Sequence, residues 1–259
     1  MSAGCGCERG HLATLETVLA SLRAEALSLA PMPVVSLPLR KACGKVLAAP
    51  VASSIRVPPA DNSAMDGYAV RAADVSNGAT LVVSQRMPAG AVPELLQPGT
   101  CARIFTGAEI PPGADAVIMQ EDVEVLPDGR VRLPATRAGD NIRKAGQDIE
   151  VGTRLFESGR RLRPADVGLL ASIGAATVEV HRPLRVAVLS SGDELVQPGE
   201  PLQAGQLYNS NQYTIVSTLE AQGFDVHDAG TLPDNLVATR LRLAELAESA
   251  DVVISSGGV

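Results

Sequence analysis

The C-terminal third of this sequence contains acidic residues in predicted loops that are rich in serine and glycine or contain proline. Asp193 and Glu194 follow the Ser/Gly loop 190–192, and Asp234 stands in another loop. Exposed N–H groups of Ser/Gly loops attract phosphate, and carboxylates share such a site with phosphate only if a cation bridges them. Mg²⁺ is the usual hard cation for that role. We therefore expect a magnesium-assisted phosphate site, although a single acid is more often a helix cap or a surface residue.

Two further stretches carry groups suited to an oxyanion. Residues 139–152 (GDNIRKAGQDIEVG) hold Arg143, Lys144 and Asp148 between glycines, and Thr106 follows an apolar run in residues 104–120. Arginine presents a planar fork of donors and lysine a point charge, so both suit an anion. The alternatives are a solvated loop whose charges pair among themselves and, for Thr106, an ordinary hairpin corner.

The most unusual stretch is residues 61–70 (DNSAMDGYAV). Small and polar residues surround Asp66, and Gly67 permits a positive φ or a close approach of two backbones. The alternative to a functional role is a tight turn that opens a domain, with Asp66 as its turn or cap residue.

Composition narrows the class of protein. The chain has 259 residues, of which 46% are hydrophobic and 2% aromatic, and its formal net charge is −7. This length predicts more than one domain, with cores of aliphatic residues. The acidic balance argues against nucleic acid as the main partner, and no apolar run is long enough to span a membrane. Since no secretory signal pattern opens the chain, we expect a cytoplasmic protein.

The four cysteines do not predict a disulfide framework in a chain of this length. Cys5 and Cys7, with His11 nearby, have the residue types of a metal site. No second ligand pair has zinc-type spacing, so the alternative is an unstructured leader in a reducing cytosol.

The carboxyl part of the chain has the pattern of a parallel sheet. An apolar run ends at Leu189, before the first Ser/Gly loop. Periodicity and cap residues then predict a helix at 209–222, a strand at 224–229, a helix at 236–250 and a strand at 251–255. This β-α-β-α-β order is the half-unit of a doubly wound sheet, in which ligands bind beyond the carboxyl ends of the strands. Both Ser/Gly loops and the loop with Asp234 would emerge there.

The middle of the chain has a different texture. Apolar runs alternate with Gly/Pro turns and predict strands at 80–84, 101–105, 116–120 and 124–133, the last with a hairpin turn at residues 127–129. The flanks predict helices at 12–29, 40–49 and 153–173, and strands at 34–39, 51–57 and 176–180. Six apolar residues of the first helix follow the spacing of one buried face: Leu15, Val18, Leu19, Leu22, Ala26 and Leu29.

The predicted fold class is therefore α/β and β-rich multidomain. Residues 1–59 form the N-terminal helix and the first part of a mixed α/β linker domain, and residues 148–182 form its second part. Residues 60–147 form an inserted β-rich domain. Residues 183–259 form a doubly wound parallel α/β domain that we expect to be incomplete.

Taken together, these motifs resemble one family. DNSAMDGYAV, IFTGAEIPPGADAVIMQED, NIRKAGQDI, VAVLSSGDEL and the terminal VVISSGGV stand in the order and spacing of the molybdopterin molybdenumtransferase family, MoeA, which is related to the gephyrin E domain. The similarity runs from the first helix to Val259. The last domain would then bind molybdopterin.

The resemblance implies a reaction, the insertion of molybdate into adenylylated molybdopterin with release of AMP, promoted by Mg²⁺. The implied catalytic residues are Asp66, Thr106, Arg143, Asp148, Glu194 and Asp234. The implied metal ligands are Asp193, Glu194 and Asp234. Substrate binding is expected from Lys144, Ser190, Ser191, Gly192, Ser255, Ser256, Gly257 and Gly258.

The resemblance also implies partners. The expected protein is a homodimer whose site lies between the parallel-sheet domain of one subunit and the β-rich domain of the other. The molybdopterin adenylyltransferase is a further expected partner, whereas nucleic acid and membrane are not.

One departure from the family bears on activity. The family continues beyond SSGGV, whereas this chain stops there, so we expect that 1–259 does not insert molybdenum alone. An inactive fragment of the enzyme is therefore one alternative. A gephyrin-like scaffold is another, and it would call for an extra N-terminal domain and a long linker. An adenylyl-transferring relative would not need the β-rich block.

Overall fold

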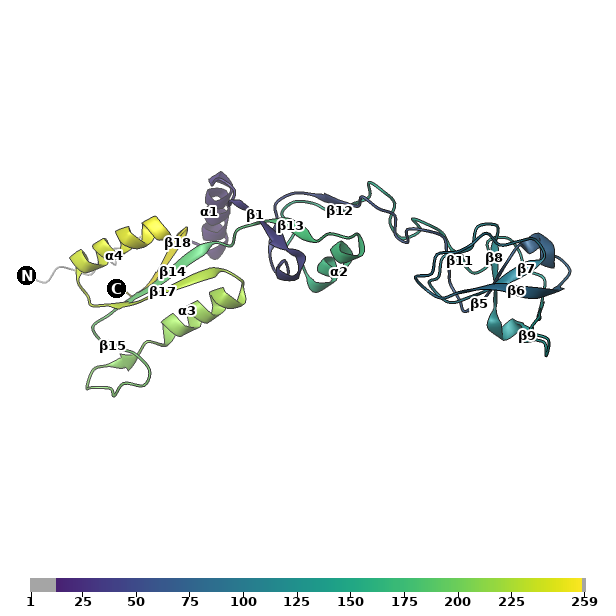
Figure 1. Cartoon of the computed structure of the whole chain (residues 1–259). Helices are drawn as coiled ribbons and strands as arrows, with labels where there is room; N and C mark the ends of the chain where they lie inside the picture. Colours follow the sequence, from purple (N-terminus) through teal and green to yellow (C-terminus); the bar gives the residue numbers. More distant parts are fainter. Residues whose placement is uncertain (1–12, 258–259) are drawn as a thin grey trace, which may run out of the picture. The chain divides into compact units, whose positions relative to one another are not determined.

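The computed structural model describes residues 13–257, which divide into two units. One unit is Leu37–Val178, and the other combines the segment up to Ser36 with the segment from Glu179. Strand-rich sheets and helices are both present (Figure 1), so the expected α/β and β-rich multidomain class is confirmed. The finer division at residues 60, 148 and 183 stays a prediction.

A six-stranded sheet dominates the unit Leu37–Val178, in the order β8-β5-β7-β6-β10-β9. Its strands are β5 (Gly67–Val70), β6 (Ala79–Met87), β7 (Thr100–Ile104), β8 (Ala116–Met119), β9 (Glu124–Val125) and β10 (Val131–Leu133). Neighbouring strands are antiparallel except β6 and β7, which are parallel. The strands predicted for this region and the hairpin turn between β9 and β10 are confirmed, whereas β5 is not predicted by the sequence analysis.

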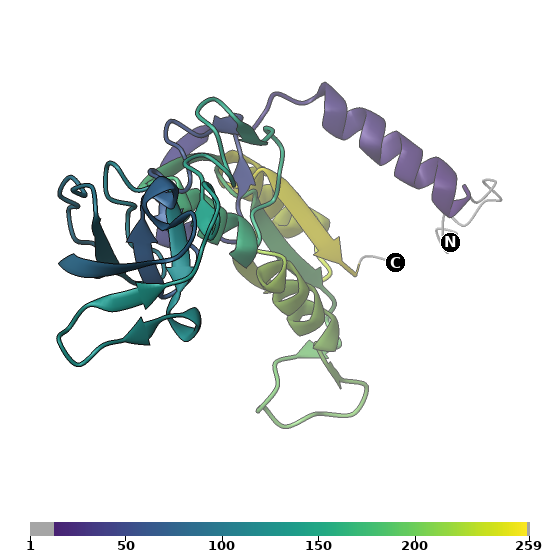
Figure 2. The ribbon, with the colours of Figure 1, turned by 90° about the vertical axis from the view of Figure 1, so that its right-hand side faces the viewer.

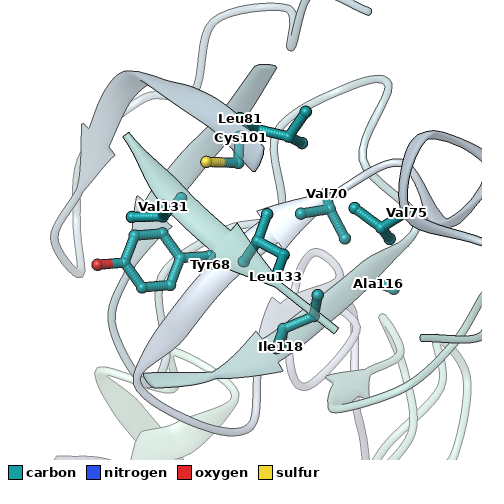
Figure 3. Packing of buried hydrophobic residues seen from close by; sticks show 9 residues of the cluster. All are labelled: Tyr68, Val70, Val75, Leu81, Cys101, Ala116, Ile118, Val131 and Leu133. Atoms are coloured by element: carbon teal, nitrogen blue, oxygen red, sulfur yellow. The ribbon is translucent and has the colours of Figure 1, made fainter. Parts of the chain in front are cut away.

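Two apolar clusters cover the two faces of this sheet. The cluster shown in Figure 3 consists of Tyr68, Val70, Val75, Leu81, Cys101, Ala116, Ile118, Val131 and Leu133. The other includes Ala69, Met87, Ala102, Ile104 and Val117. Successive side chains of a strand point to opposite faces, so β5 is buried on both sides. Burial in the first cluster raises the pKa of the Cys101 thiol to about 12, which makes it a structural residue.

Residues before and after the six-stranded sheet in the chain form three smaller sheets. β4 (Asn62–Ser63) pairs with β11 (Ile142–Arg143), and β3 (Val51–Ala52) pairs with β12 (Arg154–Phe156). A three-stranded sheet has the order β1-β13-β2, built from β1 (Val34–Pro38), β13 (Thr177–His181) and β2 (Val46–Leu47). The strands predicted near β1 and β13 are confirmed.

Three predicted elements of the flanks are wrong in extent or type. The strand predicted at 51–57 is the two-residue β3. The helix predicted at 153–173 is only α2 (Pro164–Ser172), because β12 and a turn with a left-handed Gly159 precede it. The helix predicted at 40–49 is a short 3₁₀ turn, η1 (Leu39–Lys41), followed by β2, because Gly44 adopts a positive φ that a helix does not tolerate.

The other unit contains a parallel sheet with the order β17-β14-β18. In chain order its elements are β14 (Arg185–Ser191), α3 (Ser210–Ala221), β17 (Asp225–Leu232), α4 (Leu236–Ser249) and β18 (Val252–Ser256). The predicted β-α-β-α-β order is therefore confirmed. The two helices lie on opposite faces of the sheet (Figures 1 and 2). A short parallel pair, β15 (Leu195–Val196) and β16 (Leu207–Tyr208), lies between β14 and α3 in the chain.

The first helix is present as α1 (Leu15–Ser28), but its predicted buried face is not buried. The side chains of Leu15 and Leu22 are 69% and 60% exposed. An apolar stripe requires a partner surface as well as the right spacing, and residues 13–257 supply none. Among these residues, no helix is both long and apolar enough to cross a lipid bilayer.

A buried carboxylate fixes the start of α2. The Asp166 side chain, 5% exposed, accepts hydrogen bonds from Arg160 Nη2 at 2.8 Å and from the Arg163 N–H at 2.9 Å. The Arg160 guanidinium, followed by the Arg163 N–H, holds the pKa of Asp166 well below its usual range. Because the folded state favours the ionised form, this carboxylate stabilises the unit at neutral pH.

We predict that Asp166→Asn lowers the stability of the unit at pH 7 and that the loss shrinks in acid. The contribution of the carboxylate is fully present above its unfolded pKa of about 4 and is lost as the pH falls toward the lowered folded pKa. Denaturant unfolding at pH 7 and at about pH 3 checks this. Glu157→Gln, in an exposed pair with Arg154, is the control and should change little. An equal loss at both pH values would contradict the prediction.

Candidate functional site

Asp66 and Thr106 meet at neighbouring strand ends. Asp66 directly precedes β5, and Thr106 lies two residues after β7, its antiparallel neighbour. Asp66 Oδ1 accepts hydrogen bonds from the Thr106 N–H at 2.8 Å and from Thr106 Oγ1 at 2.7 Å. These two bonds lower the pKa of Asp66 below its ordinary value, so the carboxylate keeps its charge to a lower pH than a free aspartate does. The structure thus brings two of the predicted site residues into direct contact.

Gly67 is required by a close backbone approach. Its φ is not positive, and a Cβ at this position would lie 2.0 Å from the carbonyl oxygen of Ile118 on β8. The Gln120 N–H, just after β8, donates to the Asp66 carbonyl at 3.0 Å. Of the two explanations for Gly67 that the sequence allows, the structure selects close packing of β5 on β8, which fixes the position of Asp66.

Backbone hydrogen bonds also join the three motif stretches of this unit. The Gly107 N–H donates to the Ser63 carbonyl at 2.9 Å, and the Ala64 N–H donates to the Asn141 carbonyl at 2.9 Å. The pairing of β4 with β11 places Arg143 opposite Asn62. Residues 61–70, 104–120 and 139–152 therefore form one continuous surface region.

Arg143 and Lys144, which the sequence predicts to bind an anion, each form an ion pair with an aspartate. Arg143 Nη2 lies 2.6 Å from Asp148 Oδ2, and Lys144 Nζ lies 2.7 Å from Asp61 Oδ2. The hydrogen bond from Lys144, followed by one from the Ala145 N–H, lowers the pKa of Asp61. The charges pair among themselves, as one of the two sequence interpretations expects. Both pairs are partly exposed to solvent, so either cation remains accessible to an anion.

The second group of site residues surrounds a cavity of about 280 Å³ in the parallel-sheet unit. It lies where β14 and β18 end and α3 begins. Its lining residues are Ser191, Glu194, Leu195, Leu207, Tyr208, Asn209, Ser210, Asn211, Ser256 and Gly257. The sequence analysis predicts the serines of the strand ends, Glu194 and Gly257. The sequence analysis does not predict that residues 208–211 line a site, because Asn209 and Ser210 have the pattern of helix caps.

A row of hydroxyl groups crosses the sheet beside this cavity. Ser190 of β14 stands in register with Thr231 of β17 and with Ser256 of β18. Asn209 and Asn211, at the start of α3, donate to Thr231 Oγ1 at 3.0 Å and to Ser256 Oγ at 3.5 Å. The row therefore faces the first turn of α3. The Ser190 hydroxyl is fully buried and has no hydrogen-bond partner within residues 13–257, which is unusual for a buried polar group.

The Ser/Gly loops lie close together at the carboxyl end of the sheet. Gly257 has a φ of +108°, and a Cβ there would lie 2.1 Å from the Ser191 carbonyl oxygen. The Gly192 N–H, expected to face phosphate, instead donates to the Leu232 carbonyl at 3.1 Å. Ser255 is the residue of β18 opposite Leu189. Gly258 lies outside the described residues, as do Cys5, Cys7 and His11.

The predicted three-carboxylate metal site is not assembled. Asp193 Oδ1 accepts a hydrogen bond from the Asp234 N–H at 3.2 Å, so the two loops are adjacent. Glu194 lines the cavity. Within the described part of the chain, however, no group of three acidic, His or Cys side chains is placed to hold a metal ion. The Asp234 N–H, and not its carboxylate, faces Asp193, and the assignment of Asp193, Glu194 and Asp234 as metal ligands stays a prediction.

The predicted site residues thus fall into two sets. Asp66, Thr106, Arg143, Lys144 and Asp148 belong to the unit Leu37–Val178. The hydroxyl row, the cavity and the three acids belong to the other unit.

Comparison with known proteins matches two family models to successive parts of the chain. Residues 13–174 match the family model described as the MoeA N-terminal region (domain I and II), and residues 187–259 match the probable molybdopterin binding domain. The chain belongs to the MoeA family. The family membership expected from the sequence motifs is therefore confirmed.

Named MoeA relatives are similar over most of the chain. This chain is 44% identical over 225 residues to the molybdopterin molybdenumtransferase of Haemophilus influenzae. The aligned region covers 85% of this chain and 55% of the relative. The enzyme of the same name from a Nostoc species is 41% identical, over 83% of this chain and 51% of the relative. The chain spans about half the length of these curated relatives.

The fold agrees with a solved MoeA structure. A crystal structure of the molybdopterin biosynthesis MoeA protein from Pyrococcus horikosii aligns with a TM-score of 0.80 at 34% identity. The alignment covers 95% of this chain and 64% of that one.

We predict that Gly67→Ala destabilises the unit Leu37–Val178, which we call the β-rich unit, by about 1–3 kcal/mol, because the added methyl group forces β5 away from β8. Gly168→Ala in α2 is the matched control, since nothing lies within 4 Å of a Cβ there. The control should be neutral or slightly stabilising. Hydrogen exchange of β5 amides measures both effects. Equal protection of β5 in the two variants would contradict the close-packing explanation.

Proposed function

We propose that this MoeA-family chain acts in molybdenum cofactor biosynthesis as a molybdopterin molybdenumtransferase. Its substrates are adenylylated molybdopterin and molybdate, and its by-product is AMP. The names of the relatives support this activity. The observation that carries it to this chain is the cavity lined by Ser191 and Ser256 at the carboxyl end of a parallel sheet, where α3 begins.

The cavity suits the phosphates of the pterin substrate. Hydroxyls of Ser191 and Ser256 and the amide of Asn211 supply neutral donors. The first turn of α3 adds N–H groups and the positive end of the helix dipole. Glu194 on the same wall is the one anionic side chain among the lining residues, so phosphate charge there requires compensation.

We propose Mg²⁺ as the compensating cofactor. Mg²⁺ is usually bound by one or two carboxylates together with substrate phosphates and waters, rather than by a cage of protein ligands. Glu194 and its chain neighbour Asp193 supply this reduced ligand set, whereas Asp193, Glu194 and Asp234 together do not form a metal-binding group among the described residues. When bound, the ion would neutralise phosphate charge.

Molybdate is assigned to the β-rich unit. We propose that Arg143 binds its oxygens through charge-assisted hydrogen bonds, and that the Thr106 hydroxyl turns its single proton from Asp66 to the anion. Asp148 orients Arg143, and Asp66 orients Thr106, through the contacts of 2.6 and 2.7 Å. Arg143, which has further N–H groups beside the one on Asp148, is therefore held in place before the anion arrives, which limits the ordering cost of binding. Lys144, held by Asp61, adds positive charge beside them.

Because the two sets of residues lie in separate units, we propose that they act in a homodimer. The β-rich unit of one subunit would meet the parallel-sheet unit of its partner, as the family resemblance implies. The molybdopterin adenylyltransferase would deliver the substrate in the cytoplasm. The free thiols of Cys43 and Cys101 are in keeping with a reducing compartment.

The test is turnover by the purified protein. Adenylylated molybdopterin, molybdate and Mg²⁺ are added, and AMP release and activation of an apo-molybdoenzyme are measured. Activity of residues 1–259 would give both signals, each dependent on molybdate, and would overturn the sequence-based expectation that this stretch does not insert molybdenum alone. Binding of the adenylylated pterin without either signal would favour an inactive fragment, and absence of binding would overturn the assignment.

We predict that Arg143→Ala raises the molybdate concentration for half-maximal activity about tenfold or more, because a charge-assisted hydrogen bond to the anion is lost. Arg130→Ala is the matched control, because Arg130 also forms an exposed pair with an aspartate but lies in the β9–β10 hairpin. Initial rates over a molybdate series measure the effect. An unchanged molybdate dependence would show that Arg143 only supports its loop.

We also predict that Asp66→Asn and Glu194→Gln, each inactive as a homodimer, regain partial activity when mixed. A heterodimer keeps one site with both carboxylates if each site draws Asp66 from one subunit and Glu194 from the other. AMP release after subunit exchange is the measurement, and exchange is verified with differently tagged chains. Complete exchange without recovered activity would count against a shared site.

A further inference from the structure

Arg103 on β7 contacts every chain segment that holds the Asp66–Thr106 pair. Its Nη1 donates to the Gly67 carbonyl at 2.9 Å, and its Nη2 donates to the side-chain carbonyl of Gln120. Its guanidinium also stacks on two rings, 5.1 Å from the centroid of Tyr68 and 4.8 Å from that of Phe105. None of the motif-based predictions involves this residue.

Each of these contacts lies beside the pair. Gly67 and Tyr68 follow Asp66, and Phe105 precedes Thr106. The third segment is that of Gln120, whose N–H donates to the Asp66 carbonyl at 3.0 Å. A single planar cation therefore links β5, the end of β7 and the end of β8. Only a guanidinium supplies two divergent donors and two stacking faces at once.

We propose that Arg103 is a positioning residue that holds the Asp66 carboxylate against the hydroxyl and N–H of Thr106. The proposal rests on the proposed function, in which Asp66 and Thr106 belong to the molybdate site. Arg103 acts through its neighbours and is not assigned a contact with substrate.

The positive charge of Arg103 also favours the ionised form of Asp66. The pKa of Asp66 is lowered chiefly by the two hydrogen bonds from Thr106, and the positive charge of Arg103 adds to them. Glu121 is the opposing charge in this network, because it accepts a hydrogen bond from the Gln120 amide at 3.1 Å. Losing Arg103 would therefore loosen the pair and weaken the preference of Asp66 for its ionised form.

Arg86 offers a matched control. Its guanidinium stacks on Phe105 at 4.8 Å, the same distance as that of Arg103. Within the described residues it donates no hydrogen bond to the segments of Gly67 or Gln120. Arg86→Gln thus removes a stacked cation of the same type without removing the link.

The test compares Arg103→Gln, Arg103→Lys and Arg86→Gln in the full chain. Carbon NMR of labelled aspartate follows the Asp66 titration, and hydrogen exchange follows the Thr106 amide. Arg103→Gln should raise the pKa of Asp66 and speed exchange at Thr106 roughly fivefold to tenfold, as expected for one lost hydrogen bond. Arg103→Lys should speed exchange similarly but retain part of the effect on titration, because it keeps the charge but not the fork. Arg86→Gln should do neither.

Two results would overturn the positioning role. One is an Arg103→Gln protein, folded by its β-sheet amide protection, that behaves like Arg86→Gln. The other is an Arg103→Lys protein in which the Thr106 amide exchanges at the wild-type rate. This second result decides the question if Arg103→Gln does not fold. If the Asp66 titration shifts while molybdenum insertion is unchanged, the positioning role stands and the proposed part of Asp66 in the function fails.

Discussion

The burial of β5 on both faces is the constraint on which the β-rich unit depends. Four residues, Gly67–Val70, lie between β7 and β8 with both faces covered, so the strand has one possible position. The absence of a side chain at Gly67 lets β8 approach, and the same approach brings Gln120 to the Asp66 carbonyl. Asp66 is therefore a half-buried carboxylate at the end of a rigid strand. Polar groups mounted on packed strands are positioned more accurately than groups on free loops.

The parallel-sheet unit positions its polar groups by a different rule. Parallel strands end at one edge, so Ser190, Thr231 and Ser256 align without any local sequence signal that links them. The buried amide of Gln212 and the cap residue Asn209 then tie the first turn of α3 to β17 through Thr231. The N–H groups that α3 presents to the cavity are thus fixed to the sheet that carries the serines.

Local patterns in the sequence predicted much of this fold. The β-α-β-α-β order follows from period and caps, and the β9–β10 hairpin follows from its turn residues. β5 was not predictable because it lies among turn-forming residues and shows no alternation of polar and apolar residues, being buried on both faces. The long helix expected before Gly174 was wrong in extent, because the spacing of apolar residues in its first half fits β12 equally well. The face of α1 shows that amphipathic spacing does not reveal what, if anything, covers it.

The candidate site was predictable as a set of residues but not as a set of contacts. Lys144 meets Asp61 across 83 positions of sequence, and Asp66 meets Thr106 across 40. No single sequence encodes such pairings in a readable form. Arg103 illustrates the same limit, since the residues next to it in the chain do not show that it, rather than Arg86, contacts the segments of Gly67 and Gln120.

The Ser190 hydroxyl has a thermodynamic consequence. A buried hydroxyl without a partner lowers folding stability by about 1–3 kcal/mol relative to a paired one. A molecule that supplies the missing hydrogen bond regains that free energy, in addition to its other contacts, only when the protein is folded. Ser190 is not among the residues that line the cavity, so only molecules that open its cover and pair with this hydroxyl should raise the melting temperature by more than their cavity contacts account for. Thermal shift thus becomes a way to rank fragments of the substrate by the depth to which they enter the sheet.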